Sequence, residues 1–275
     1  YRDLVAFAKQ HELILLSDSD IKVEPDFLRR MLAPLEDPEV ALTTAFYRST
    51  CPNGLWNGLE ALSVNAHFMP QAVFAASLGM RFAMGAAILV RRERFERSGG
   101  FQAMANHLAD DFILGVEVAR AGGRIEIADC VVDSVPDVEN GLEHLKHQVR
   151  WARTIRICQP GGYFGTLLLH GFSFVTLELL LLGPNSASLA LAGALLLAKT
   201  ACEALVAAAA GRAPTPRALW MMPLSEWTAF AAWLTGFRVK RVLWRGELYA
   251  VHEQGRLTPL PSRAAPVVEL ASAAD

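Results

Sequence analysis

The chain has 275 residues, a formal net charge of −2 and four cysteines, so it can hold one large domain or two. The nearly neutral charge, without a basic stripe interleaved with aromatic residues in the first part of the chain, gives no indication of nucleic-acid binding. The cysteines are too far apart for a zinc site or a disulfide framework, which favours a reducing cytoplasmic location. They are Cys51, Cys130, Cys158 and Cys202.

Charged residues are frequent in the first part of the chain and rare in the segment 163–237. The first part has the mixed composition of a soluble α/β domain, whereas the second has that of membrane helices. We therefore predict three regions, which are a folded α/β domain over 1–160, a membrane region over 163–237 and a cytoplasmic tail over 238–275. Within this tail we expect residues 263–275 to be disordered.

The first predicted elements lead to a pair of carboxylates. Asp3–Gln10 is predicted to be an amphipathic helix, and the aliphatic run Leu13–Leu16 to be a parallel strand buried on both faces. Asp18 and Asp20 follow this strand directly. Because ligands of open α/β sheets bind beyond the carboxyl ends of the strands, this pair can hold Mg²⁺ or Mn²⁺ together with a nucleotide diphosphate. The alternative is a solvated turn without a ligand.

The rest of the first region alternates between helices and strands, as an α/β fold requires. Gly85 is interpreted as a turn residue. The expected elements are a helix from Pro25 to Leu35 that Asp37–Pro38 stops, a strand over Val40–Tyr47, a helix over Leu55–Ser77 broken at Pro70, a strand over Ala86–Val90, a short helix ending at Ser98–Gly100, a helix over Asp110–Arg120 capped by Gly122–Gly123, a strand over Arg124–Val132 and a helix over Glu139–Ile157.

A second pair of carboxylates, Asp110 and Asp111, begins one of these helices. The N-terminus of a helix favours ionised carboxylates. The loop before the pair begins with Gly99–Gly100 and can form part of an active site. The pair is therefore a candidate functional site, and a helix cap with its neighbour is the alternative.

A third cluster lies in the helix predicted over Glu139–Ile157. His147 shares a helix face with Arg150 and Trp151, which follow it by three and four residues. A guanidinium beside an indole can neutralise a diphosphate through forked hydrogen bonds and stack on a ring. The alternative is a basic, tryptophan-bearing helix that anchors the chain at a membrane.

Two apolar segments, Tyr163–Leu182 and Ser186–Ala210, are each long enough to cross a bilayer as a helix. The turn Gly183–Ser186 joins them, which predicts a membrane hairpin rather than two buried helices of a soluble bundle. A third segment, Ala218–Phe237, contains a proline and a glutamate and has basic residues on both sides. Because basic flanks favour the cytoplasmic side, we expect a re-entrant or interfacial helix there. Its expected headgroup anchors are Trp220, Trp227, Trp233 and Trp244.

The three clusters, in this order and before membrane segments, resemble those of the membrane-bound ceramide glucosyltransferase family, including relatives associated with bacterial hopanoid biosynthesis. The resemblance covers most of the chain. The matching positions are Asp18 and Asp20 for the metal site, Asp111 for the base, Arg150–Trp151 for the end of the last motif and Trp244–Tyr249 for the C-terminal stretch.

The resemblance implies the C-terminal part of a GT-A-like, Rossmann-like glycosyltransferase domain followed by transmembrane helices. It implies an inverting, Mg²⁺- or Mn²⁺-dependent transfer of a sugar from a UDP-sugar to a hydroxyl of a membrane lipid of ceramide or hopanoid type. The implied location is a bacterial inner membrane, with the catalytic domain in the cytoplasm. Asp111 would be the catalytic base, and the donor and its diphosphate are assigned to His147, Arg150, Trp151 and Asp110.

The sequence departs from the family pattern at two places. His147 stands where the family has Gln or Arg, and a histidine can still donate a hydrogen bond. The first aspartate of the pattern has no counterpart, so we expect the chain to be a fragment of a longer protein. Two alternatives stay open at this point, which are a processive polysaccharide synthase and a non-catalytic membrane relative.

Overall fold

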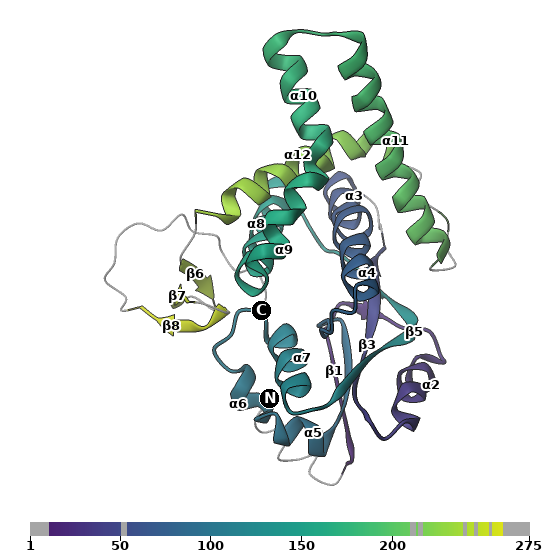
Figure 1. The fold of residues 1–275 in the computed structure, drawn as a ribbon, viewed down its shortest axis with the longest axis vertical. Coiled ribbons are helices and arrows are strands. Elements are labelled where there is room, and N and C mark those ends of the chain that lie inside the picture. The colour runs from purple at the N-terminus through teal and green to yellow at the C-terminus, as the bar shows by residue number, and fades with distance from the viewer. Residues whose placement is uncertain are drawn as a thin grey trace. The chain divides into compact units, whose positions relative to one another are not determined.

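The computed structural model describes most of the chain and shows a mixed α/β architecture (Figure 1). The predicted helix over Asp3–Gln10 and the predicted disorder of residues 263–275 lie outside the described residues. The described ranges are 11–50, 54–209, 213, 217–238, 241–244, 247–252 and 255–260.

The chain forms two compact units, and each consists of several segments. The first, here called the sheet unit, comprises residues 1–52, 67–105 and 109–137. The second, here called the helical unit, comprises residues 53–66, 106–108 and 138–275. Residues 53–66 and 106–108 thus pack with the C-terminal part, although sequence reasoning grouped them with their neighbours in the chain.

The sheet unit is built on a mixed five-stranded sheet with the order β1-β4-β3-β5-β2. β3 and β5 are parallel, and β4 runs antiparallel to both β1 and β3. The strands of the predicted α/β alternation all form, with ends within about two residues of those expected. They are β1 (Leu13–Ser17), β3 (Val40–Ser49), β4 (Ala87–Arg91) and β5 (Arg124–Ser134). The two-residue strand β2 (Ile21–Lys22) was not predicted.

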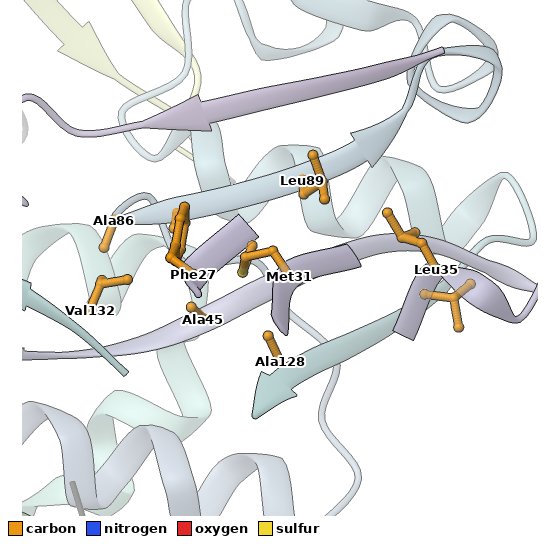
Figure 2. Packing of buried hydrophobic residues seen from close by; sticks show 10 residues of the cluster. Phe27, Met31, Leu35, Ala45, Ala86, Leu89, Ala128 and Val132 are labelled. Atoms are coloured by element: carbon orange, nitrogen blue, oxygen red, sulfur yellow. The ribbon is translucent and has the colours of Figure 1, made fainter. Parts of the chain in front are cut away.

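Two apolar clusters cover the opposite faces of this sheet. Leu89 of β4 packs in one cluster and Ile88 in the other, because successive side chains of a strand point to opposite faces. Figure 2 shows the first cluster, in which Phe27 and Met31 of α2 pack over the sheet. Burial of each such side chain contributes about 1.5–3 kcal/mol.

The helices of the sheet unit follow from these clusters. α2 supplies the first face and α5 and α7 the second, so the sheet lies between two helical layers. The elements are α2 (Phe27–Leu32) with the 3₁₀ turn η1 (Ala33–Glu36), α4 (Met69–Ser77), α5 (Arg92–Arg97), α6 (Gly100–Met104) and α7 (Asp110–Arg120).

Two predictions about the first strand are wrong. Leu13–Leu16 was expected to be a parallel strand buried on both faces. Instead, β1 pairs antiparallel with β4 as the last strand of the sheet on its side, and Leu15 is 41% exposed. The run of aliphatic residues identified a strand correctly. It could not distinguish a central strand from an edge strand, because that depends on pairing partners elsewhere in the chain.

The helical unit contains the long helices of the chain (Figure 1). α12 packs against α3, α8, α10 and α11. The π-helical segment η2 (Ser63–Phe68) separates α3 from α4 and interrupts the predicted helix over Leu55–Ser77 just before Pro70. The elements are α3 (Leu55–Leu62), α8 (Gly141–Cys158), α9 (Pro160–Gly165), the 3₁₀ turn η3 (Thr166–His170), α10 (Gly171–Leu182), α11 (Ser186–Ala209) and α12 (Ala218–Gly236).

Two helical stretches of this unit, Pro160–Leu182 and Ser186–Ala209, are long and apolar enough to cross a membrane. Only 22% and 11% of their most apolar windows are buried within the protein. Leu180 and Leu182, for example, are 76% and 81% exposed. A helix of this composition in the core of a soluble bundle would be mostly buried, so these exposed leucines suggest membrane association.

α12 is helical over the third apolar segment but does not meet the same criteria for a span. Pro223 lies inside the helix, and Glu226 is fully buried and paired with Lys199 at 2.7 Å. The prediction of Trp233 as a headgroup anchor is wrong, because this side chain is 8% exposed and packs against Tyr163 and other aromatic rings.

The helical unit ends in a small antiparallel sheet that the predicted tail did not include. Its strands are β6 (Arg241–Trp244), β7 (Glu247–Val251) and β8 (Leu257–Pro259). Residues 106–108 pair with this region, since the Leu108 N–H donates to the carbonyl of Gly255 at 2.9 Å. Part of the region after residue 238 is therefore ordered structure.

Candidate active site

The first pair of carboxylates lies where β1 ends. Asp18 and Asp20 are exposed and flank a turn that leads into β2. The Asp18 N–H donates to the carbonyl of Ala86 at 3.3 Å, because β1 pairs with β4 and Ser17 lies opposite Ala87. The strand register thus places Asp18 beside the turn that precedes β4.

This turn, Met84–Ala87, is held in place from the neighbouring strand as well. The buried hydroxyl of Thr44 on β3 accepts a hydrogen bond from the Met84 N–H at 3.0 Å and donates to the carbonyl of Ala87 at 3.1 Å. A buried side chain therefore satisfies a backbone donor and a backbone acceptor of the turn. These hydrogen bonds fix the backbone of the turn.

Asp111 reaches the same turn from α7. Its Oδ2 accepts a hydrogen bond from the Gly85 N–H at 2.8 Å, and its Oδ1 accepts one from the Phe112 N–H at 2.7 Å. One helical turn later, Gly115 lies so close to the chain that a Cβ there would be 2.7 Å from the Ala83 nitrogen. The absence of a side chain at Gly115 lets α7 approach this segment closely, and Asp111 then meets Gly85.

The surroundings of Asp111 alter its proton affinity. Burial, together with the negative charges of Asp110 and Asp18, outweighs the lowering effect of the two backbone hydrogen bonds and raises the pKa of this carboxyl to about 6. A carboxylate with a pKa near neutrality is suited to accept a proton during a reaction. Strongly perturbed groups of this kind are concentrated at functional sites.

Asp110 has a different environment from its neighbour. Its side chain is exposed, and its Oδ1 accepts a hydrogen bond from the Asp111 N–H at 3.0 Å. The N-cap residue of α7 is Ala109, without a side-chain hydrogen bond, so Asp110 does not have the capping position expected from the sequence. It lies in the first turn, where its charge is favoured by the helix dipole.

The third predicted cluster lies on α8, in the helical unit. Asn140 caps this helix, since its Oδ1 accepts a hydrogen bond from the Glu143 N–H at 3.0 Å. Arg150 is exposed, whereas His147 and Trp151 are partly buried. The structure therefore joins Asp18 and Asp111 at one turn of the sheet unit and presents Arg150 on a well-capped helix of the other unit.

One buried carboxylate, Glu60 on α3, was not predicted from the sequence. Its Oε2 lies 2.6 Å from the Nδ1 of His144 on α8, and His147 and Gln148 also face it. Two signals could have identified it. Glu60 is a single acidic residue in an apolar helical segment, and its three partners follow helical spacing at positions 144, 147 and 148.

Residues 4–257 match the family described as Glycosyl transferase family 21. The chain belongs to this family. The match covers nearly the whole chain and confirms the family resemblance drawn from the order of its motifs. As a family 21 glycosyltransferase, the protein uses a sugar donor and an acceptor.

Asp18 and Asp20, at the end of β1, offer carboxylate oxygens of the kind that a divalent cation would need in this family 21 enzyme. Among the residues that the structure describes, no group of three or more His, Cys, Asp or Glu side chains could hold a metal ion. Mg²⁺ and Mn²⁺ need fewer protein ligands, because waters and substrate phosphates complete their coordination shell. Asp18 and Asp20 are exposed carboxylates, and the negative charge of Asp18 helps to raise the pKa of Asp111. A cation at Asp18 and Asp20 would offset that repulsion.

Proposed function

We propose that this glycosyltransferase inverts the sugar configuration while transferring the sugar from a UDP-sugar to a hydroxyl of a membrane lipid. The observation that carries the proposal is the placement of Asp111 at the turn beside Asp18, with a pKa raised to about 6. In this arrangement Asp111, which could accept a proton, lies beside carboxylates that could bind the metal and diphosphate of the sugar donor. The acceptor class, ceramide or hopanoid, follows from the family resemblance.

In the proposed reaction Asp111 acts as the general base. The acceptor hydroxyl oxygen attacks the anomeric carbon, the bond from that carbon to the diphosphate oxygen breaks, and the hydroxyl proton passes to a carboxylate oxygen of Asp111. The two backbone N–H groups that bind this carboxylate fix its orientation. Attack from the face opposite the leaving group gives inversion.

The diphosphate leaves with a growing negative charge that the protein must stabilise. Asp18 and Asp20 would hold Mg²⁺ or Mn²⁺, which would neutralise part of this charge when bound. Arg150 offers an exposed, permanently charged guanidinium that can form forked hydrogen bonds to phosphate oxygens. Trp151 and His147 neighbour it on α8, and we assign them and Asp110 to donor binding.

The two long apolar helices support a membrane lipid as the acceptor. We propose that Pro160–Leu182 and Ser186–Ala209 cross a bacterial inner membrane as a hairpin, with the catalytic part and the region after Arg238 both in the cytoplasm. A lipid acceptor could then present its hydroxyl without leaving the leaflet. Two spans return the chain to the side from which it entered, which agrees with the basic residues around α12.

The function is tested by supplying the purified protein with radiolabelled UDP-sugars, Mn²⁺ and vesicles that contain ceramide or a hopanoid alcohol. Formation of a labelled glycolipid with inverted anomeric configuration would support the proposal. Polymer formation without a lipid acceptor would instead favour a processive synthase. Binding of UDP-sugar without transfer to either lipid would contradict the acceptor class.

The orientation is tested by labelling single cysteines in a variant whose four native cysteines are serines. We expect Glu96→Cys and Arg256→Cys to react from the same side of sealed vesicles, and Pro184→Cys in the hairpin turn to react from the other. Each position is exposed in the structure. Reaction of positions 96 and 256 from opposite sides would contradict two spans.

A further inference from the structure

Glu60 is a charged residue in the interior of the helical unit. Its side chain is 8% exposed, and the neighbouring residues Leu59, Ala61 and Leu62 of α3 are fully buried. Transfer of an isolated carboxylate from water to such surroundings is strongly unfavourable. Favourable contacts with its partners must therefore offset the cost of burying the Glu60 carboxylate.

All these partners come from a single face of α8. The Nδ1 of His144 lies 2.6 Å from Oε2 of Glu60, and the Nε2 of Gln148 donates to the same oxygen at 3.1 Å. The Nδ1 of His147 lies 3.6 Å from the other oxygen, Oε1. Since these residues are three and four positions apart, one carboxylate contacts two successive turns of the helix.

The protonation states of this cluster follow from its geometry. Burial by itself would raise the pKa of Glu60, but hydrogen bonds from His144 and His147, together with their charge, outweigh burial and lower this pKa to about 2. An ionised carboxylate can only accept hydrogen bonds, so the Nδ1 of His144 and the amide of Gln148 are donors. The Nε2 of His144 is buried and has no hydrogen-bond partner among the described residues.

Two further contacts fix α3 against the start of α8. The Oδ1 of Asn57 accepts a hydrogen bond from the Val138 N–H at 2.8 Å. A Cβ at Gly141 would lie 2.6 Å from the ring of Trp56, so only glycine allows the observed approach. These contacts hold the start of α8 against α3, whereas Glu60 contacts the side of the helix further along.

The rotation of α8 decides where its exposed side chains point. His147 and Gln148 face Glu60, and Arg150 and Trp151 follow them within one turn. Apolar side chains could repack around a rotated helix, but a carboxylate with directional partners fits one arrangement. We propose that Glu60 is a positioning residue, which fixes the rotation of α8 and so directs Arg150 and Trp151 to the diphosphate of the donor. This inference rests on the proposed function.

A double-mutant cycle on the whole chain in detergent tests the inference. UDP binding in the presence of Mn²⁺ is measured by calorimetry for the wild type, Glu60→Gln, Arg150→Ala and the double variant. We expect each single substitution to weaken UDP binding about tenfold, as the loss of a hydrogen bond to a charged group does. If Glu60 acts through Arg150, the double variant binds UDP about as weakly as Arg150→Ala alone.

Glu226→Gln is the matched control, because it removes another buried carboxylate of the helical unit, one paired with Lys199 rather than with α8. We expect Glu226→Gln to change UDP affinity by no more than about twofold, both in the otherwise wild-type protein and together with Arg150→Ala, as an uncoupled site does. A role of Glu60 in stability alone would give the same pattern as this control.

The outcomes separate the inference from the function on which it rests. If Glu60→Gln binds UDP with the affinity of the wild type, the positioning role alone is overturned. Additive losses of UDP affinity in the double variant would overturn it as well. Failure of the wild-type protein to bind UDP with Mn²⁺ would overturn the proposed function and this inference together.

Discussion

Asp111 of the sheet unit and Glu60 of the helical unit are two carboxylates withdrawn from solvent, and their surroundings shift their pKa values in opposite directions. Burial and, to a smaller extent, like charges nearby outweigh the two backbone hydrogen bonds that Asp111 receives, so its pKa is raised to about 6. Glu60 receives hydrogen bonds from histidines, and its pKa is lowered to about 2 despite burial. Burial alone would have raised both.

The difference separates a group that can exchange a proton from a group that holds structure. A carboxylate without a cationic partner keeps an affinity for protons near neutral pH, which a general base requires. A carboxylate that accepts hydrogen bonds from several groups stays ionised and fixes the orientation of the side chains that bind it.

Asp111→Asn should nearly abolish transfer. Asn keeps the shape of the side chain and one accepting oxygen, but it cannot take the proton of the acceptor hydroxyl, and loss of a general base typically costs about 10²–10⁴ in rate. UDP-sugar affinity should change little. Asp110→Asn is the matched control with a smaller loss, since Asn can still accept from the Asp111 N–H. Initial rates measure both, and a near-normal rate for Asp111→Asn would show that Asp111 is not the base.

Asp20→Ala should abolish the dependence of donor binding on divalent cations. The substitution removes one of two carboxylates assigned to the metal, and the folded sheet should tolerate it because the side chain is exposed. Titration of UDP with and without Mn²⁺ measures the effect. An unchanged Mn²⁺ dependence would contradict the metal site at the end of β1.

Gly85→Ala should lower the transfer rate about tenfold while the protein still folds. A Cβ at this position would lie 3.1 Å from Oδ2 of Asp111, closer than most such contacts, so the carboxylate must shift by a few tenths of an ångström. A small misplacement of a reacting group can cost one or two orders of magnitude in rate. Gly161→Ala is the control, because a Cβ there would have no atom of the described part of the chain within 4 Å. Equal rates for both variants would argue against the role of this turn.

The two carboxylates should also affect thermal stability with opposite signs. The raised pKa of Asp111 means that its ionisation destabilises the folded state as pH rises from about 4 to about 6, so Asp111→Asn should raise Tm at pH 7.5 by a few degrees. The lowered pKa of Glu60 means that it stabilises the fold above about pH 4.5, an effect lost as pH falls toward 2. Glu60→Gln should therefore lower Tm at pH 7.5.

These melting curves are best recorded in detergent with a chelator, so that no cation changes the charge near Asp18. Both differences should shrink as pH falls, the first below about pH 4 and the second toward pH 2. A decrease of Tm in Asp111→Asn at pH 7.5 would show that this carboxylate is held by favourable contacts and is not poised to accept a proton.

Local sequence determined most elements of the fold. α7 has the predicted bounds, because a first turn with two aspartates and the glycines at 122 and 123 define its ends within the segment itself. The long apolar helices were equally clear, since their composition alone sets them apart. The order of the motifs was sufficient to indicate glycosyl transferase family 21.

Only the tertiary structure decided which residues meet. The register of β1 on β4 puts Asp18 beside Ala86, and the close approach allowed by Gly115 puts Asp111 on Gly85, although these residues are far apart in sequence. Glu60 and His144 form a pair across 84 residues. Helical periodicity and caps are local properties that a sequence displays directly, whereas strand order, burial and pKa depend on contacts between distant segments, which no single segment specifies.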